Sequence, residues 1–323
     1  MPPGLADKVA FLRSRCGPGD EAVETHFAWV FLTGDRALKL RKPVRRETMD
    51  YASLEARRSG AEAEVALNRR LAPQVYLGTV PLTLEAGGRL ALRGTGEPVD
   101  WLVEMRRLDR RLMLDAALEG GRVEAAGLRR VATMLAAFYS GAEPAITRPR
   151  ELTGRLLLKV EANRAVLRTL DAPQADRLAA RQAAAIERLA PELDARVARG
   201  CVIEAHGDLR PEHIFLGEPP AVIDCLEFDR DLRILDRAEE LSLLELECAR
   251  IGHAEAGRHL REACLERLHD RPSQDLLALY RSHRAATRAK LYVWRADEPD
   301  GATPEDWRAR ARRYLEDDSQ LGA

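Results

Sequence analysis

The sequence predicts an α+β fold in which an antiparallel sheet with one helix comes first and a mainly helical region follows. The sheet is indicated by short runs of β-branched and aromatic residues in the first third of the chain, with turn residues between them. The helices are indicated by apolar residues that recur every three or four positions from about Leu108 onward. A chain of 323 residues suits two lobes, which we expect at residues 1–105 and 106–323.

The first third is expected to contain a hairpin, a helix and further strands. Residues 26–33 and 36–42 form the predicted hairpin, because Gly34-Asp35 between them is a two-residue turn signal. Residues 49–71 are rich in Ala, Glu, Arg and Leu, which predicts a helix that Pro73 ends. Shorter strands are predicted at residues 75–80, 82–85, 89–93 and 101–105, with Gly87-Gly88 as a second hairpin turn.

The remainder is expected to be helical around one different segment. One apolar stripe runs from Leu128 to Phe138, and a second runs from Leu178 to Val197. Residues 201–228 combine short apolar runs with prolines and polar residues, and helices resume near Leu235 and continue to the end. Thr303-Pro304 predicts the start of the last helix, with Thr as N-cap and Pro at the first helical position.

Composition excludes several classes of protein. The chain has 46% hydrophobic and 32% charged residues, which is typical of a soluble globular protein. The formal net charge of -1 gives no basic field for nucleic acid. The five cysteines are scattered, so we expect reduced thiols and no zinc site or disulfide framework. Residues 1–10 do not resemble a signal peptide and no run is long enough to span a membrane, so we expect a cytoplasmic protein without membrane contact.

The strongest chemical signal lies in residues 206–216 (HGDLRPEHIFL), followed by residues 221–224 (AVID). Asp208 and Asp224 each lie next to a short apolar run, and a tight loop separates the two runs. One carboxylate can orient or accept the proton of an attacking hydroxyl, and the other can hold magnesium, which prefers oxygen ligands. Phosphoryl transfer requires little beyond such positioning and charge neutralisation.

These residues resemble the catalytic loop of kinases in the form found in aminoglycoside phosphotransferase-like enzymes. Together with residues 24–26 (ETH), 67–73 (LNRRLAP) and 223–229 (IDCLEFD), the chain is similar to a bacterial group of aminoglycoside phosphotransferase family enzymes. The resemblance implies a two-lobed protein kinase-like fold that uses ATP and Mg2+. It implies that Asp208 is the catalytic aspartate, that Arg210 touches the transferred phosphate and that Asp224 binds the metal. Some members of the group carry a P-loop ATPase domain, but no G-x-x-x-x-G-K-[ST] motif occurs in these 323 residues.

The resemblance also implies a lysine that contacts the ATP phosphates and a glutamate that pairs with it. Lys39 in the predicted return strand fits the lysine, with Lys42 beside Pro43 as its competitor. Glu64 is the expected partner on the helix, and Glu62 is the alternative on another face. At the expected hinge between the lobes, backbone groups of Glu104 and Met105 are expected to meet adenine.

The sequence departs from the kinase pattern in two places. No G-x-G-x-x-G precedes Lys39, so another loop must cover the phosphates, either residues 23–28 or the Gly34 turn. His213 occupies the position where kinases have a metal-binding asparagine. Imidazole nitrogen suits zinc or manganese better than magnesium, so His213 either alters the second metal site or only holds the loop by hydrogen bonds.

The acceptor is expected to bind among the C-terminal helices. Four acids follow Asp236 and could bind a cationic substrate such as an aminosugar, although a charge run of this kind is more often a solvated face: Glu239, Glu240, Glu245 and Glu247. The cations Arg281, Arg284, Arg288 and Lys290 could equally bind an anionic acceptor.

The sequence therefore predicts a small-molecule kinase that phosphorylates a hydroxyl group. The alternative is a nucleotide-binding pseudokinase that serves as a regulatory or partner module, which the missing glycine loop and His213 favour. The presence of Lys39, Asp208 and Asp224 opposes it. A protein kinase is disfavoured, since no Ala-Pro-Glu segment follows Asp224.

Overall fold

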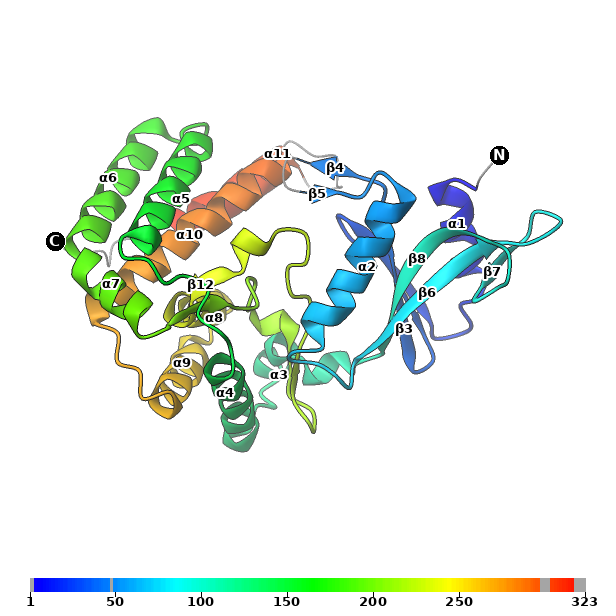
Figure 1. Cartoon of the computed structure of the whole chain (residues 1–323), viewed down its shortest axis with the longest axis horizontal. Coiled ribbons are helices and arrows are strands. Elements are labelled where there is room, and N and C mark those ends of the chain that lie inside the picture. The colour runs from blue at the N-terminus through cyan, green and yellow to red at the C-terminus, as the bar shows by residue number, and fades with distance from the viewer. Residues whose placement is uncertain (1–2, 47–48, 297–302, 317–323) are drawn as a thin grey trace. The chain divides into compact units, whose positions relative to one another are not determined.

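A computed structural model describes residues 3–46, 49–296 and 303–316, and it confirms the expected α+β architecture (Figure 1). The chain forms two compact units. The first comprises residues 1–127 and 212–232, and the second comprises residues 128–211 and 233–323. The first unit thus extends past residue 105, where we expected the division into lobes, and that division stays a prediction.

The first unit is built on a six-stranded antiparallel sheet with strand order β1-β2-β3-β8-β6-β7. In chain order the strands are β1 (Glu21–Glu24), β2 (Ala28–Thr33), β3 (Arg36–Arg41), β6 (Tyr76–Leu84), β7 (Leu90–Leu92) and β8 (Glu97–Arg106). Two short strands, β4 (Arg45–Arg46) and β5 (Met49–Asp50), pair separately. The expected hairpin is confirmed, and Gly34 in its turn has a φ of 55°, a left-handed conformation that glycine adopts without strain.

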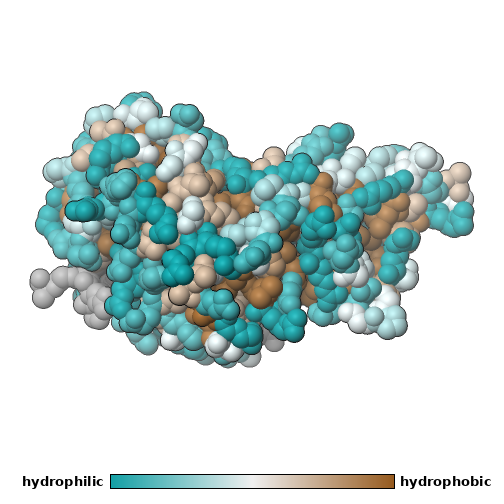
Figure 2. Space-filling model, turned by 90° about the horizontal axis from the view of Figure 1, so that it is seen from below, coloured by the Kyte–Doolittle hydropathy of each residue, from teal (hydrophilic) through white to brown (hydrophobic). Residues whose placement is uncertain are grey.

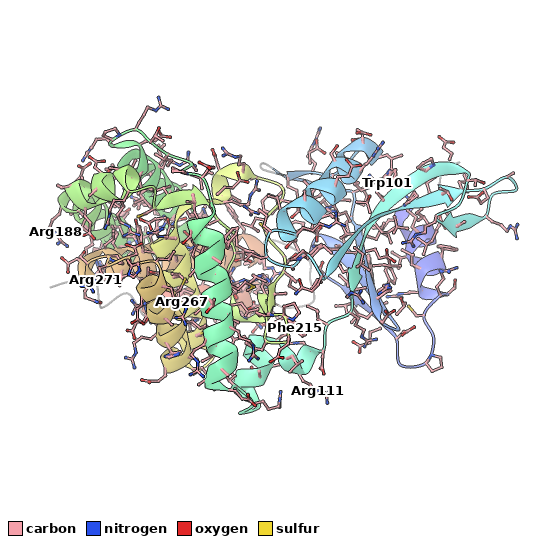
Figure 3. The ribbon with its side chains drawn as sticks, turned by 60° about the horizontal axis from the view of Figure 1, so that its bottom comes forward. Trp101, Arg111, Arg188, Phe215, Arg267 and Arg271 are labelled. Atoms are coloured by element: carbon pink, nitrogen blue, oxygen red, sulfur yellow. The ribbon has the colours of Figure 1, made fainter. Side chains whose placement is uncertain are left out.

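One helix lies against each face of this sheet. Helix α1 (Leu5–Arg13) contributes Val9 and Leu12 to an apolar cluster on one face. Helix α2 (Leu54–Asn68) contributes Ala61 and Val65 to a cluster on the other. On the outer side of α2, the Arg58 guanidinium stacks over the Trp101 ring of β8 at 4.9 Å, and Figure 3 shows Trp101 beside this helix.

Two boundaries differ from the sequence prediction in this unit. The helix expected from residue 49 begins at Leu54, because Ser53 caps it by accepting a hydrogen bond from the Ala56 N–H at 3.0 Å. It ends at Asn68, before Pro73. The two strands expected at residues 75–80 and 82–85 form one strand, β6, which passes through Pro81 with register shifts at Tyr76/Gly78 and Leu82/Thr83.

Residues 212–232 complete the first unit and carry much of the predicted chemistry. They include a 3₁₀ turn (Pro211–His213), the paired strands β10 (Ile214–Phe215) and β11 (Ala221–Val222), and a second 3₁₀ turn (Arg230–Leu232). Ala221 is fully buried in the same apolar cluster as α2, and Phe215 packs against that cluster. The 3₁₀ turn Arg110–Leu112 and helix α3 (Leu114–Glu119) follow the sheet in the same unit.

The second unit is mainly helical. Its helices are α4 (Ala125–Ser140), α5 (Glu151–Leu167), α6 (Ala172–Arg188), α7 (Ala190–Ala198), α8 (Arg237–Arg250), α9 (Ala254–Arg267), α10 (Gln274–Ala296) and α11 (Pro304–Glu316). Strands β9 (Val202–Glu204) and β12 (Ile234–Asp236) pair antiparallel. One apolar core joins residues of α5, α6, α8, α10 and α11. Figure 3 shows Arg267 of α9 beside α4, where its Nε donates to the Thr133 hydroxyl at 3.1 Å.

The helix prediction for this unit was incomplete. Helix α5 was missed, and the stripe from Leu178 to Val197 is two helices, because Pro191 lies in the first turn of α7. The expected cap is confirmed, since the Thr303 hydroxyl accepts a hydrogen bond from the Asp306 N–H at 3.2 Å. Residues 317–323, where helix was also expected, lie outside the described residues.

Hydrophilic side chains cover most of the face of the molecule shown in Figure 2, with smaller hydrophobic areas between them. Within the described part of the chain, none of the helices is long and apolar enough to cross a bilayer. The five cysteines form no disulfide, as expected, and four of them are buried.

Candidate functional site

In the first unit, Lys39 of β3 lies between two carboxylates. Its Nζ is 2.9 Å from Glu64 Oε1 on α2 and 3.0 Å from Asp224 Oδ1. Burial lowers the pKa of Lys39, but the carboxylates of Asp224 and Glu64 outweigh it and hold the pKa well above its ordinary value. Lys39 is therefore a charged lysine with one buried partner, Glu64, and one half-exposed partner, Asp224.

The two sequence alternatives lie elsewhere. Lys42 Nζ pairs with Glu24 at 2.6 Å, and the Glu62 carboxylate is half-exposed and pairs with Arg58 at 3.0 Å. The structure thus places Lys39 with Glu64, the pairing that we expected, and their role toward a nucleotide stays a prediction.

Strand alternation explains why β3 presents Lys39 to α2. Successive side chains of a strand point to opposite faces, so Leu38 and Leu40 join the apolar cluster on the α1 side. Lys39 and Arg41 point to the other face, where both contact the Glu64 carboxylate. Strand β3 therefore places two cations on the face of the sheet that α2 covers, where both contact the Glu64 carboxylate.

Asp224 occupies an unusual backbone conformation that its neighbours maintain. Its φ is 62°, in the left-handed region that non-glycine residues rarely adopt. Its N–H donates to the Tyr76 hydroxyl at 3.1 Å, and the Cys225 N–H donates to Asn68 Oδ1 at 2.9 Å. The Ile223 N–H donates to the His213 carbonyl at 3.0 Å. These bonds fix the peptide groups around Asp224 while half of its side chain stays exposed.

Asp224 fits a magnesium ligand better than His213 does. Magnesium is commonly held by one or two carboxylates, with water and nucleotide phosphates completing the octahedron, and Asp224 offers an exposed carboxylate for this. His213 is buried, and its Nε2 lies 3.7 Å from Asp224 Oδ2, close to the same position but with a nitrogen donor. Among the described residues there is no group of three or more His, Cys, Asp or Glu side chains arranged to hold a metal ion.

In the second unit, Asp208 faces two guanidinium groups. Arg210 Nε lies 2.9 Å from Asp208 Oδ2, and Arg288 Nη1 of α10 lies 3.9 Å from Oδ1. Arg288 is itself held by Glu247 of α8, whose Oε1 is 3.0 Å from the Arg288 Nε. The Asp208 side chain is partly exposed, so it can be reached by an acceptor while its charge is balanced.

The backbone just before Asp208 is held from two helices. The Gly207 N–H donates to Glu240 Oε1 of α8 at 2.6 Å, and the Gly207 carbonyl accepts from Arg284 of α10 at 2.9 Å. Tyr139 of α4 donates a further hydrogen bond to Glu240 at 2.8 Å. Gly207 has a φ of 93°, which a residue with a side chain would adopt only under strain.

Comparison with solved structures finds proteins with the same fold. The GDP and kanamycin complex of APH(2")-IIia aligns with a TM-score of 0.55 and 17% identity, over 95% of this chain and 94% of that one. Choline kinase LicA from Streptococcus pneumoniae aligns with a TM-score of 0.56 and 13% identity, over 96% and 97%. A choline/ethanolamine kinase family protein from Mesorhizobium loti gives 0.55 and 15%, over 98% and 97%.

The chain has the fold of the aminoglycoside phosphotransferases and choline kinases.

Sequence comparison adds relatives but no activity. The chain is 33% identical over 281 residues to proteins called uncharacterized in Mycobacterium bovis and Mycobacterium tuberculosis. The match covers 83% of this chain and 53% of theirs, so the chain spans about half the length of the curated relatives it matches. No protein-family model matches the sequence.

This kinase-like fold corrects the expectation of a solvated acidic face on α8. Glu239, Glu240 and Glu247 are buried. Each has partners within the second unit: Glu239 lies 3.3 Å from His283, Glu240 accepts from Gly207, and Glu247 accepts from Tyr314 at 2.9 Å. Ten of the fourteen residues of α8 are buried, so these three acids lie inside the unit, while Glu245 is partly exposed and pairs with Arg261 at 2.8 Å.

The two residues expected at the hinge belong to the sheet of the first unit. Glu104 and Met105 lie inside β8, paired with Leu38 and Ala37 of β3 on one side and with β6 on the other. Their backbone groups therefore face neighbouring strands, and the Glu104 carboxylate pairs with Arg93 at 2.6 Å. A role of either residue toward adenine stays a prediction.

Sequence reasoning missed several of the charged residues around Lys39 and around Asp208. Arg41 could have been found from β3, because a residue two positions after Lys39 shares its face. Glu227 carried no such signal, and Glu240 and Arg288 were noted only as members of charge runs. The turn between β1 and β2, where kinases carry glycines, consists of Thr25, His26 and Phe27.

Proposed function

We propose that the protein is an ATP- and magnesium-dependent phosphotransferase that acts on a hydroxyl group of a small molecule. The observation that carries the proposal is the pair of contacts at Lys39, whose ammonium meets a buried helix glutamate and the exposed carboxylate of Asp224. A lysine held in this way is suited to contact nucleotide phosphates, and Asp224 is suited to bind the accompanying metal.

Each residue then has a specific part in the reaction. Glu64 holds Lys39, which positions the phosphates of ATP. Asp208 orients the acceptor hydroxyl and accepts its proton as the oxygen attacks the γ-phosphorus and the bond to ADP breaks. Arg210 neutralises charge on the phosphoryl group in transfer. Magnesium, when bound at Asp224, neutralises charge on the phosphates.

The charges of the second unit favour one class of acceptor in this proposal. Acids could bind the ammonium groups of an aminosugar only where they are exposed, but three of the four acids of α8 are buried and have partners within the protein. The α8 acids therefore do not support a polycationic acceptor, although structures with this fold include complexes with kanamycin. A neutral polyol or a hydroxyl compound with an anionic group suits the surroundings of Asp208 better, because Arg210 and Arg288 lie beside it.

The alternative is a nucleotide-binding module without catalytic activity. It is favoured by the Thr25–Phe27 turn without glycine and by His213 beside Asp224. Both readings predict nucleotide binding, and only the kinase predicts turnover.

Two measurements test the proposal. Magnesium-ATP at millimolar concentration should raise the Tm, because it binds the folded state only. Sugars, sugar acids, polyols, amino alcohols and nucleosides should then be screened for acceptor-dependent ADP release, with Asp208→Asn as the inactive control. A thermal shift without release from any acceptor would favour the non-catalytic module, and the absence of any shift would contradict both readings.

A further inference from the structure

Arg41 is a buried cation that the proposed reaction does not use. It lies two residues after Lys39 on β3 and is 1% exposed. Its Nη2 donates to two carboxylates, Glu64 Oε2 and Glu227 Oε1, the latter at 2.8 Å. Glu64 is therefore shared between two cations, one oxygen facing Lys39 and the other facing Arg41.

Glu227 is the second end of this contact and lies three residues after Asp224. Its Oε1 accepts hydrogen bonds from Arg41 and from the Tyr51 hydroxyl at 2.8 Å. Tyr51 also lies under the Arg41 guanidinium, whose carbon is 5.2 Å from the ring centre. The burial of Tyr51 and the nearby Glu227 carboxylate raise the pKa of the phenol, so its hydroxyl stays a donor at neutral pH.

Different residues hold the two ends of segment 224–227, which contains the proposed metal ligand Asp224. The Tyr76 hydroxyl and the Asn68 side-chain oxygen hold the beginning of the segment by accepting hydrogen bonds from the N–H groups of Asp224 and Cys225. The side chain of Glu227 holds its end against β3. Because Asp224 has a left-handed φ of 62°, the segment needs contacts on both sides to keep this conformation.

We propose that Arg41 is a positioning residue that, through Glu227, fixes segment 224–227 so that the Asp224 carboxylate can bind magnesium together with the nucleotide. The inference rests on the proposed function and deepens it. It assigns to the Arg41–Glu227 pair the coupling between metal and nucleotide, and to the Lys39–Glu64 pair the contact with the phosphates.

The test measures this coupling without requiring turnover. A nonhydrolysable ATP analogue is titrated with excess EDTA and again with Mg2+, and the ratio of the two Kd values reports the coupling. Glu227→Gln keeps an acceptor for Tyr51 but removes the charge that Arg41 holds. We expect the ratio to fall by about fivefold or more, while the Kd in EDTA changes by a smaller factor, because Lys39 keeps its own contact with Glu64.

A matched control is present in the same unit. Lys8 of α1 is also buried, and it pairs with the buried Asp100 of β8 at 2.8 Å and donates to the Val99 carbonyl, so its described contacts lie away from segment 224–227 and Tyr51. Lys8→Met should lower the Tm and leave the coupling ratio unchanged. Tyr51→Phe should lower the coupling ratio less than Glu227→Gln does. Arg41→Lys should keep part of the coupling between metal and nucleotide.

The outcomes separate the two proposals. Failure of the wild-type protein to bind the analogue with Mg2+ would refute the proposed function and this inference with it. Normal metal coupling in the wild type together with an unchanged ratio in Glu227→Gln would refute the inference alone. An equal fall in Lys8→Met would also overturn the inference, because the effect would then be general loosening of the unit. If Arg41→Lys does not fold, Glu227→Gln and Tyr51→Phe decide the question.

Discussion

Lys39 Nζ lies 3.0 Å from Asp224 Oδ1, a contact that joins residues 185 positions apart in the chain. The proposed phosphate-binding lysine and the proposed metal ligand thus form an ion pair with each other. Half of the Asp224 side chain is exposed, so the pair contributes little to stability and can separate readily. A nucleotide with its metal supplies a new partner to each, which makes the pair suitable for exchange upon binding.

Replacement of Lys39 by Met should weaken nucleotide binding by about ten- to a hundredfold, because charge-assisted hydrogen bonds to phosphate are lost. Lys42→Met is the matched control, since Lys42 follows directly after β3 but pairs with Glu24. Calorimetric titration of both variants with Mg-ATP measures the effect. Equal losses in the two variants would contradict the assignment of Lys39.

Replacement of Asp208 and of Asp224 by asparagine should impair different parts of the proposed reaction. Asp208→Asn should abolish acceptor-dependent ADP release and leave the Kd for Mg-ATP nearly unchanged, because Asp208 acts on the acceptor. Asp224→Asn should lose the magnesium dependence of nucleotide binding. Binding and turnover are measured on both variants, and the division of roles would be wrong if they behaved alike.

His213→Asn should change the metal preference if the imidazole is a ligand. Its Nε2 is 3.7 Å from Asp224 Oδ2, and magnesium prefers oxygen donors, so the amide should raise the ratio of magnesium to manganese activity. Turnover of wild type and variant is titrated with each metal at saturating ATP. If the ratio stays constant while the Tm falls, the His213 imidazole only holds the loop.

Asp270 should make the second unit sensitive to acid. Burial raises the pKa of its carboxyl, but hydrogen bonds from Arg196 and the charges of Arg196 and Arg237 outweigh burial and lower it from 3.8 to about 2. The unfolded chain therefore binds the proton more tightly. Ionised Asp270 stabilises the fold above pH 3.8, and this contribution, roughly 2 kcal/mol, is lost as the pH falls toward 2.

Urea unfolding at pH 6 and pH 3 measures the contribution of Asp270. Asp270→Asn should lower the free energy of unfolding at pH 6 by about 3 kcal/mol, because Arg196 loses a buried partner. It should also reduce the loss of stability between the two pH values by roughly 1 kcal/mol. Asp275→Asn, which breaks an exposed pair with Arg188, should change either value by less than about 0.5 kcal/mol. The same pH dependence in wild type and Asp270→Asn would refute the assignment.

The sequence alone determined the features that depend on short segments. The α+β order followed from local periodicity, and the first hairpin followed from the Gly34-Asp35 turn between two strand-like runs. Lys39, Asp208 and Asp224 could be selected because each lies in a recognisable local pattern. Strand alternation also implies that Arg41 shares a face with Lys39.

Only the tertiary structure decided which charged residues form ion pairs. Glu64 was preferred over Glu62 by its place in the helix, but its contact with both Lys39 and Arg41 depends on how α2 packs on the sheet. The burial of the α8 acids was not predicted, because the burial of a helix depends on how many neighbours surround it. Helix periodicity describes only a helix that has one face in solvent. The pairing of Arg41 with Glu227 joins residues 186 positions apart, and no local pattern specifies it. Long-range packing determines the ion-pair partners, because the energy of a buried charge depends on every protein group that takes the place of its hydrating water.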